Sequence, residues 1–151
     1  MLTSVSLDAS VLLAAVSPSE PSHEDAKDFL TQLHQRQLTV QVPAQFMLEI
    51  FAAFRRSPRD TNQLGFMTKA NPMQLKLLCL GEAEVTDLIA WLSQAFPQRV
   101  PTRGGDLAYL WVAWKFHIPL VSLDGGMLRY SGPDAEVISP AQGLSRIADA
   151  G

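Results

Sequence analysis

The sequence lacks the features that identify secreted, disulfide-bonded and membrane proteins. Cys79 is its single cysteine, so no disulfide can form within the chain, and this composition suits a reducing cytosol. Because its neighbours are leucines, we expect Cys79 to lie in the core. No apolar run approaches the roughly 18 residues needed to span a membrane, and the first residues lack the basic start of a signal peptide. We therefore expect a cytoplasmic protein with no membrane segment.

Basic residues and histidines are also scarce. Twelve Lys and Arg residues against fifteen Asp and Glu residues give a formal net charge of −3, which excludes the broadly basic surface of many nucleic-acid-binding proteins. Contacts to nucleic acid, if there are any, must therefore be local. His23, His34 and His117 are scattered, and we expect them at the surface or at helix ends. No Cys or His pair has zinc-ligand spacing, so a zinc site is disfavoured.

What is present is the composition of a globular protein, with 47% apolar and 18% charged residues in 151. We expect one domain, residues 1–151, without repeats. Apolar periodicity predicts strands at 3–7, 38–42, 74–80, 118–123 and 136–139, and helices at 9–16, 23–35, 43–56, 59–70, 83–96, 106–116 and 141–148. Ser22 is a candidate helix cap and Pro43 a candidate first-turn residue. This alternation predicts an α/β fold with a central parallel sheet covered by helices.

Two acidic residues fall where predicted strands end. Asp8 is the only charged residue among the first nineteen, and Asp124 follows the apolar run at 118–123. Open parallel sheets bind ligands in the crevice beyond the carboxyl ends of their strands, which is where both carboxylates are expected. Purely structural alternatives exist: Asp8 could cap the following helix, and Asp124 with Gly125 could form a hairpin turn. The lack of a returning strand favours a turn at the end of a parallel strand.

Two further acidic residues belong to predicted helices. Glu49 is the only charge between Arg36 and Arg55, in a helix apolar on almost every side. Such a helix is expected to be buried, and a buried ionised carboxylate costs several kcal/mol unless it is paired or binds a metal. The alternative is a narrow exposed stripe shared with Gln45. Asp106 follows two glycines and opens an apolar helix, so it could equally be a helix cap.

Taken together, the four carboxylates Asp8, Glu49, Asp106 and Asp124 predict one metal site. Clustered carboxylates repel one another unless cations neutralise them, and all-oxygen ligands favour Mg²⁺ or Mn²⁺. The natural substrate of such a site is a phosphate ester. We assign the three aspartates to metal coordination, and Glu49 either to coordination or to holding a metal-bound water.

Three segments resemble, in order and spacing, the sequence blocks of PIN domains, and VapC toxins of type II toxin–antitoxin systems most of all. These segments are LDASVLLAA, VPAQFMLEIFAAF and RGGDLAYLWVAWKFHIPLVSLDGGML, and the resemblance extends from Val5 to about Pro140. It implies a three-layer α/β/α fold and a Mg²⁺- or Mn²⁺-dependent endoribonuclease. The same four carboxylates match the family's acidic positions, and Ser10 matches its small hydroxyl residue. Some members have another acid just after the last aspartate, where this chain has Gly125, Gly126 and Met127, which puts a second metal in doubt.

The resemblance also implies partners: an RNA substrate, a cognate antitoxin and a second copy of the chain in a homodimer. The expected RNA-binding residues are basic ones near the acidic site, namely Arg55, Arg56, Arg59 and Arg103, with Lys69 and Arg129 as further candidates. The segment 58–72 is expected at the groove or the dimer seam. Trp91, Trp111 and Trp114 could stack on bases, but their helical spacing favours core or dimer packing.

Three other interpretations remain. A phosphoryl-accepting receiver domain also gathers acids at strand ends, but it needs adjacent acids after its first strand, where this chain has Asp8-Ala9-Ser10. A catalytically silent PIN module would not need all four acids. An RNA-processing nuclease without an antitoxin would have the same chemistry and a different biological role.

Overall fold

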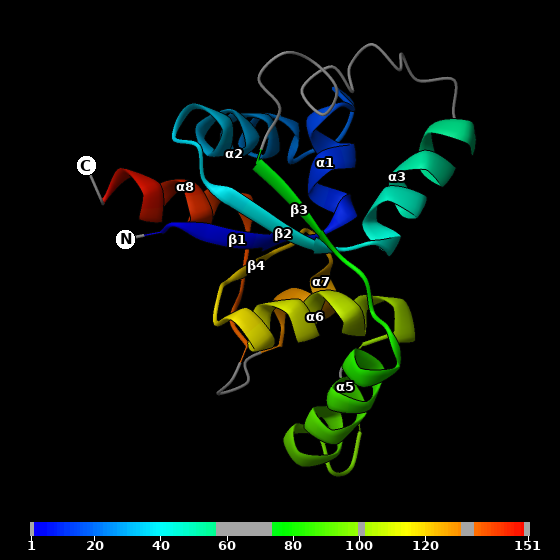
Figure 1. Cartoon of the computed structure of the whole chain (residues 1–151). Helices are drawn as coiled ribbons and strands as arrows, with labels where there is room; N and C mark the ends of the chain where they lie inside the picture. Colours follow the sequence, from blue (N-terminus) through cyan, green and yellow to red (C-terminus); the bar gives the residue numbers. More distant parts are fainter. Residues whose placement is uncertain (1, 57–73, 100–101, 131–134, 150–151) are drawn as a thin grey trace.

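A five-stranded parallel sheet forms the centre of the molecule (Figure 1). The computed structural model describes residues 2–56, 74–99, 102–130 and 135–149. Its strands are β1 (Ser4–Leu7), β2 (Thr39–Pro43), β3 (Gln74–Leu78), β4 (Leu120–Val121) and β5 (Val137–Ile138), in the spatial order β3-β2-β1-β4-β5. All neighbouring strands pair in parallel, so the predicted parallel sheet is confirmed. The helix predicted at 59–70 lies outside the described residues.

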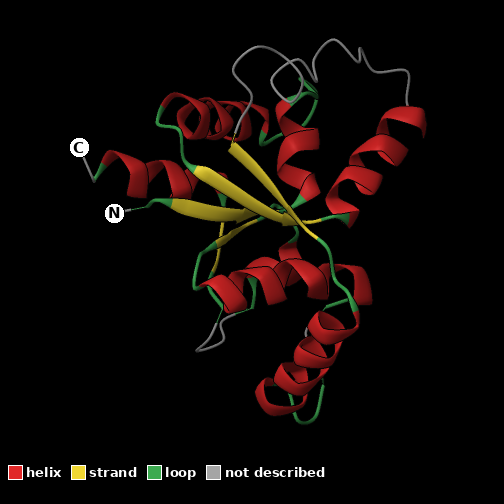
Figure 2. Ribbon diagram, in the orientation of Figure 1, coloured by secondary structure: helices red, strands yellow, loops and turns green. Residues whose placement is uncertain are grey.

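Helices cover both faces of this sheet, which gives the predicted three-layer α/β/α arrangement (Figures 1 and 2). One layer contains α1 (Ala9–Ala15), α2 (His23–Gln35) and α3 (Gln45–Arg56), and α8 (Pro140–Ala148) packs beside α2. The other contains α6 (Gly104–Phe116) and the short α7 (Gly125–Leu128), with α5 (Glu82–Ala95) beyond α6. In the described part of the chain, no helix is both long and apolar enough to cross a membrane.

The core follows from the apolar pattern of the central elements. Val5 and Leu7 of β1 have no exposed surface, because β2 and β4 flank this strand and helices cover both its faces. On the opposite side of α6 from the sheet, Trp114 stacks on Trp91 of α5 with ring centroids 5.1 Å apart. Trp91 and Trp111 are almost completely buried. The prediction that the tryptophans pack inside is therefore confirmed for these two.

Several local expectations were wrong in ways that have simple causes. Pro43 ends β2 instead of opening the next helix, which begins at Gln45. The expectation of Ser22 as the N-cap of α2 is confirmed for its position, although its side chain makes no capping hydrogen bond. Cys79 is exposed, although a core position was expected. It follows β3, which is an edge strand with Leu77 47% exposed, so apolar neighbours there do not mean burial.

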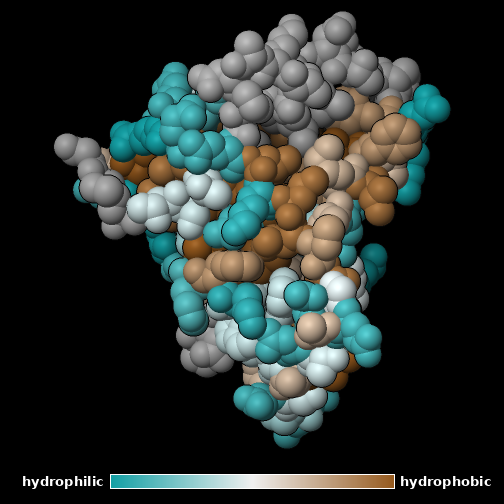
Figure 3. Space-filling view, in the orientation of Figure 1, coloured by the Kyte–Doolittle hydropathy of each residue, from teal (hydrophilic) through white to brown (hydrophobic). Residues whose placement is uncertain are grey.

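Helix α3 is also less buried than its composition suggested. Only Phe46, Ile50 and Phe54 are buried, on the face that points to the core. Leu48 is 70% exposed and Phe51 is 64% exposed, and the space-filling view shows hydrophobic surface over this helix (Figure 3). The expectation of a helix buried on nearly all sides was therefore wrong. Glu49 lies between the two faces and is partly buried.

Candidate active site

Asp8 is placed by the end of the central strand. Leu7 is the last residue of β1 and pairs with Val121, the last residue of β4. The next amide, of Asp8, donates to the carbonyl of Val121 over 2.9 Å, and the chain then enters α1. Asp8 occupies the N-cap position of α1, but its carboxylate makes no capping hydrogen bond. The N-cap position expected as the alternative is therefore confirmed, and the carboxylate has further partners.

Two serine hydroxyls hold the Asp8 carboxylate instead. Ser10 and Ser122 both donate to Asp8 Oδ2, the latter over 2.8 Å. Ser122 is completely buried, and its oxygen also accepts from the amide of Asp124 over 3.0 Å. The Ser10 oxygen accepts from the amide of Leu123 over 3.1 Å. These bonds join the ends of β1 and β4 around one carboxylate, with Asp124 directly attached to the same network.

Ser122 is a residue that sequence analysis missed. The signal was available, because Ser122 is the only side chain with a hydrogen-bonding group in the apolar run 118–123 and lies two residues before Asp124. In a strand buried on both faces, a hydroxyl needs a partner. That partner proves to be the carboxylate at the end of the neighbouring strand.

Glu49 reaches the site from α3 and is held by α6. The Tyr109 hydroxyl donates to Glu49 Oε2 over 2.9 Å, and Tyr109 has no exposed surface. Tyr109 follows Asp106 by three residues, so the two side chains lie on one face of α6. This tyrosine was also missed from the sequence, since its spacing fits a core position equally well. It connects the helix that bears Glu49 to the helix that bears Asp106.

Asp106 lies in the first turn of α6, and its carboxylate accepts a local hydrogen bond. The helix is capped by Arg103, not by Asp106, so the capping interpretation of Asp106 is wrong. The Thr102 hydroxyl donates to Asp106 Oδ2 over 2.6 Å. The amide side chain of Gln45 donates to the carbonyl of Gly105, which joins α3 to the start of α6. Thr102 is the third residue that sequence analysis did not identify.

Three of the carboxylates influence one another electrostatically. Burial raises the pKa of Asp8 above its ordinary value, opposed by the hydrogen bonds from Ser10 and Ser122, and the charge of Asp106 raises it further. Burial also raises the pKa of Glu49, opposed by the hydrogen bond from Tyr109, and the charges of Asp8 and Asp106 add to this increase. The protein therefore holds partly desolvated like charges at one edge of its sheet, an arrangement that a bound cation stabilises.

Asp124 takes part through a different local structure from the one expected. It is the N-cap of α7, and its Oδ1 accepts from the amide of Met127 over 2.8 Å. The predicted turn after β4 is thus the start of a four-residue helix. Asp124 is exposed, and it lines a pocket of about 640 Å³ together with Asp106. Two of the four carboxylates therefore face the same cavity.

The donor set suits a hard cation, although the side chains do not enclose one as they are placed. Across residues 2–56, 74–99, 102–130 and 135–149, no three Asp, Glu, His or Cys side chains are grouped tightly enough to hold a metal ion. The set nevertheless offers carboxylate oxygens, which are the donors that Mg²⁺ takes, and its like charges repel one another.

The expected basic residues separate into two groups. Arg103 and Arg129 line the pocket that contains Asp106 and Asp124. Arg55 and Arg56 lie at the far end of α3 and do not line it, and the Arg55 guanidinium lies 5.7 Å from the centre of the Phe51 ring. Arg59 and Lys69, with the whole segment 58–72, lie outside the described residues.

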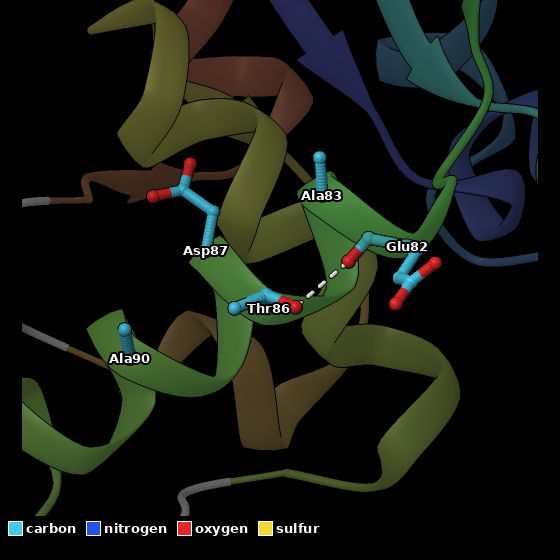
Figure 4. A pocket seen from close by; sticks show the side chains of 5 residues that line it. All are labelled: Glu82, Ala83, Thr86, Asp87 and Ala90. Atoms are coloured by element: carbon cyan, nitrogen blue, oxygen red, sulfur yellow. Dashed lines mark hydrogen bonds between the residues drawn. The ribbon is translucent and has the colours of Figure 1, made fainter.

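Another hollow, along α5, has no chemistry of this kind (Figure 4). Its lining comes from one helix, with Thr86 donating to the backbone carbonyl of Glu82 over 2.9 Å. Asp87, the other acidic residue there, already pairs with Lys115. This hollow is therefore not a second candidate for the active site.

Comparison with known proteins identifies the fold. No family model and no curated protein matches the sequence. Among solved structures, the chain is similar to VapBC2 from Rickettsia felis bound to a DNA fragment from the promoter, with a TM-score of 0.60 and 13% identity, covering 90% of this chain and 98% of that one. The fold is that of the PIN-domain VapC toxins.

The second similar structure gives the same result. It is VapC20 from Mycobacterium tuberculosis, described as a toxin that cleaves the sarcin-ricin loop, with a TM-score of 0.58 and 14% identity, covering 80% of this chain and 90% of that one. At these identities the likeness is one of fold. The VapC-like fold places the ends of β1 and β4 and the start of α6 at a common edge, which is where the carboxylates lie.

Proposed function

We propose that this protein is a Mg²⁺- or Mn²⁺-dependent endoribonuclease and the toxin of a type II toxin–antitoxin system. The main support is the partial burial of the Asp8 and Glu49 carboxylates, together with the nearby charge of Asp106, at the carboxyl edge of a VapC-like sheet. An arrangement that stabilises the fold alone would not place mutually repelling carboxylates together. Cleavage of a phosphodiester bond is a reaction for which such a site is suited.

Each side chain has a separate part in the proposed reaction. Asp8, Asp106 and Asp124 would hold the cation, which when bound supplies charge stabilisation to the phosphate. Ser10 and Ser122 fix the orientation of Asp8 through its Oδ2. Tyr109 fixes Glu49 through its Oε2, and the Glu49 carboxylate would accept a proton from the attacking water. The raised pKa of Glu49 makes it a better base than an ordinary exposed carboxylate.

The proposed partners are an antitoxin and a second copy of the chain. The similar Rickettsia felis structure is of a VapBC2 complex, which supports a cognate antitoxin here. The exposed apolar face of α3, formed by Leu48 and Phe51, supports a homodimer, because an exposed apolar patch of neighbouring side chains usually marks a protein–protein interface.

The nuclease proposal is tested with purified protein and total cellular RNA. We expect cleavage with Mg²⁺ or Mn²⁺, none with EDTA, and a loss on the order of 100-fold in Asp8→Asn. Asp28→Asn, which removes an exposed carboxylate from α2, is the matched control and should cleave normally. Equal cleavage by wild type and Asp8→Asn, or activity that survives EDTA, would contradict the metal-carboxylate mechanism.

The toxin part of the proposal has its own test. Expression of the wild-type chain should stop bacterial growth, and expression of Asp8→Asn should not. Cleavage in vitro without growth arrest would instead favour the RNA-processing nuclease without an antitoxin. Growth arrest by both chains would show that the toxicity does not come from the carboxylate site.

A further inference from the structure

Three arginines from three segments face the pocket that contains Asp106 and Asp124. Arg99 follows α5, Arg103 is the N-cap of α6, and Arg129 follows α7. None of their three guanidinium groups forms an ion pair or hydrogen bond with another side chain or with the backbone in the described part of the chain. Arg99 was not expected from the sequence, because it is seven residues from Asp106, the nearest acidic residue along the chain.

The lack of ion pairs is notable because carboxylates are available in the same pocket. Asp106 accepts a hydrogen bond from Thr102, and Asp124 accepts one from the amide of Met127. Elsewhere in the described chain, basic residues do form ion pairs, as Lys27, Lys115 and Arg146 show. The pocket therefore presents free cationic groups on one side and acidic groups on the other. A ligand that suits both has an anionic part for the arginines and a cation-binding part for the acids.

The backbone strengthens the attraction for an anion on the arginine side. Arg103 caps a helix of thirteen residues, and the start of a helix bears a partial positive charge and free amides. A Cβ built on Gly104, the first residue of α6, would have no atom within 4 Å, so space is open at this end. At about 640 Å³ the pocket is large enough for a nucleotide-sized group.

We propose that Arg99, Arg103 and Arg129 form a subsite that holds the RNA backbone phosphate next to the one being cleaved. This inference rests on the proposed nuclease function and adds to it the path that the RNA strand takes away from the scissile phosphate. The scissile phosphate lies at the acidic residues, and the strand continues over the start of α6 and the end of α7. Arginine suits this task because its guanidinium can bind two phosphate oxygens at once.

A polyanionic strand fits this arrangement better than an acidic peptide does. A peptide carboxylate would use the arginines but leave Asp106 and Asp124 facing further negative charge. An RNA strand brings one phosphate to each side, and the phosphate at the acidic side arrives with its divalent cation. Both kinds of free charge in the pocket are then used by one molecule.

Binding is measured first, in a form that does not need cleavage. The probe is a fluorescent single-stranded RNA 12-mer, titrated into Asp8→Asn protein at several salt concentrations with Mg²⁺ present. We expect Arg99→Gln and Arg129→Gln each to weaken binding about 10-fold and to reduce the slope of log affinity against log salt by about 1. Arg36→Gln, at the C-cap of α2, where the Arg36 side chain donates to Gln32 and does not line this pocket, is the control and should leave both quantities unchanged.

A second measurement locates the phosphate. In the active protein, Arg99→Gln should raise KM about 10-fold and leave kcat within about twofold. Replacing single phosphates of the probe by neutral methylphosphonates should weaken wild-type binding most at one position beside the cleaved bond. At that position the same replacement should have little effect in Arg99→Gln, because the partner of the phosphate is already gone.

These experiments distinguish a failure of the subsite proposal from a failure of the proposed nuclease function. Arginine-dependent binding without cleavage by wild-type protein would contradict the proposed function and leave the subsite standing. Cleavage with binding that is the same in wild type, Arg99→Gln and Arg129→Gln would overturn the subsite alone. Binding of a poly-glutamate peptide that depends on the arginines, with RNA binding that does not, would also overturn it. All three arginines are exposed, so their variants should fold, which thermal unfolding checks.

Discussion

At the end of β1, folding removes nearly all of the water around one carboxylate. Asp8 is only 6% exposed, and the hydroxyls of Ser10 and Ser122 replace part of its lost hydration. These bonds favour the charged form, but burial outweighs them, so the pKa of Asp8 rises above its ordinary 3.8. An ionised Asp8 therefore destabilises the folded protein, which is the expected property of a side chain retained for binding a cation.

This leads to a prediction for Asp8→Asn. Because the folded pKa is raised, wild-type stability is highest below pH 3.8 as far as Asp8 is concerned, and it decreases as pH rises to the folded pKa. At neutral pH in EDTA we expect Asp8→Asn to be more stable than wild type by about 1 kcal/mol, or about 3 °C in Tm.

Bound metal should reverse the order of stability of wild type and Asp8→Asn. Saturating Mg²⁺ stabilises only the state that binds it, by about 2.7 kcal/mol at one hundred times Kd, so wild type should then melt above Asp8→Asn. Thermal unfolding at pH 7 with EDTA and with Mg²⁺ provides both comparisons. A wild-type Tm that does not change with Mg²⁺ would argue against the cation site. If Asp8→Asn were less stable than wild type in EDTA, this would argue against a cost of burying the ionised Asp8 carboxylate.

Tyr109 is the residue through which α6 controls Glu49. Replacing it by Phe removes one hydroxyl from a completely buried ring and leaves the ring in place. Glu49 loses its fixed orientation and a hydrogen bond that lowers its pKa. We expect kcat/KM for RNA cleavage to decrease about 10-fold, the worth of one hydrogen bond to a charged group. The pH profile of kcat should shift to higher pH, because the pKa of Glu49 rises further.

A double-mutant cycle separates positioning from general loss of structure. If Tyr109 acts through Glu49, then Tyr109→Phe should have little effect in a Glu49→Gln background, since the base it positions is already absent. Two independent losses that multiply would contradict this role. Circular dichroism of each variant should match wild type.

Among the elements, the contact of α8 with α2 depends on one small residue. Gly143 lies inside α8, and a Cβ added there would lie 2.5 Å from Phe29 Cε2. Phe29 has no exposed surface, so its ring has little room to move. Alanine normally stabilises a helix interior relative to glycine, by about 1 kcal/mol, but overpacking a core costs about 1–3 kcal/mol.

We therefore predict that Gly143→Ala destabilises the protein by about 1 kcal/mol or more, against its helix propensity. Gly104→Ala is the matched control, because a Cβ there meets no atom within 4 Å, and it should be neutral or slightly stabilising. Urea unfolding of both variants gives the comparison. A more stable Gly143→Ala would mean that Phe29 can move aside at little cost.

The elements also show what a one-dimensional pattern can predict. Residues 23–35 were expected as a helix and are one, because apolar spacing and the flanking prolines agree there. The apolar run at 118–123 yields only Leu120–Val121 as strand, since Ser122 and Asp124 turn toward the site. The helix α7 was not expected, because its two glycines are typical of a turn. Cys79 was misplaced because leucine neighbours do not distinguish an edge strand from a central one.

For the whole molecule, the acidic positions could be found from the sequence and their partners could not. Asp8 and Glu49 interrupt long apolar segments, so each is conspicuous without any knowledge of the fold. Thr102, Tyr109 and Ser122 act through contacts made after folding, and each has an ordinary local role in its own segment. Arg99 joins the site only because the end of α5 returns to the start of α6.

The surface of the molecule supports a prediction about its assembly. Leu48 and Phe51 of α3 have about two thirds of their surface exposed, although a buried position would stabilise each by about 1.5–3 kcal/mol. We expect wild type to be a dimer and Leu48→Glu/Phe51→Glu to be a monomer. Losing even 3 kcal/mol of association free energy weakens a dimer more than about 100-fold.

Sedimentation velocity at micromolar concentration measures this directly. Thr31→Glu/Gln35→Glu, which adds two charges to the exposed side of α2, is the control and should stay dimeric. The α3 variant should keep its circular dichroism and lose no thermal stability beyond that of the dimer contact, because neither side chain belongs to the core of the described chain. A monomeric wild type, or an α3 variant that remains a dimer, would place the exposed face of α3 outside any homodimer interface.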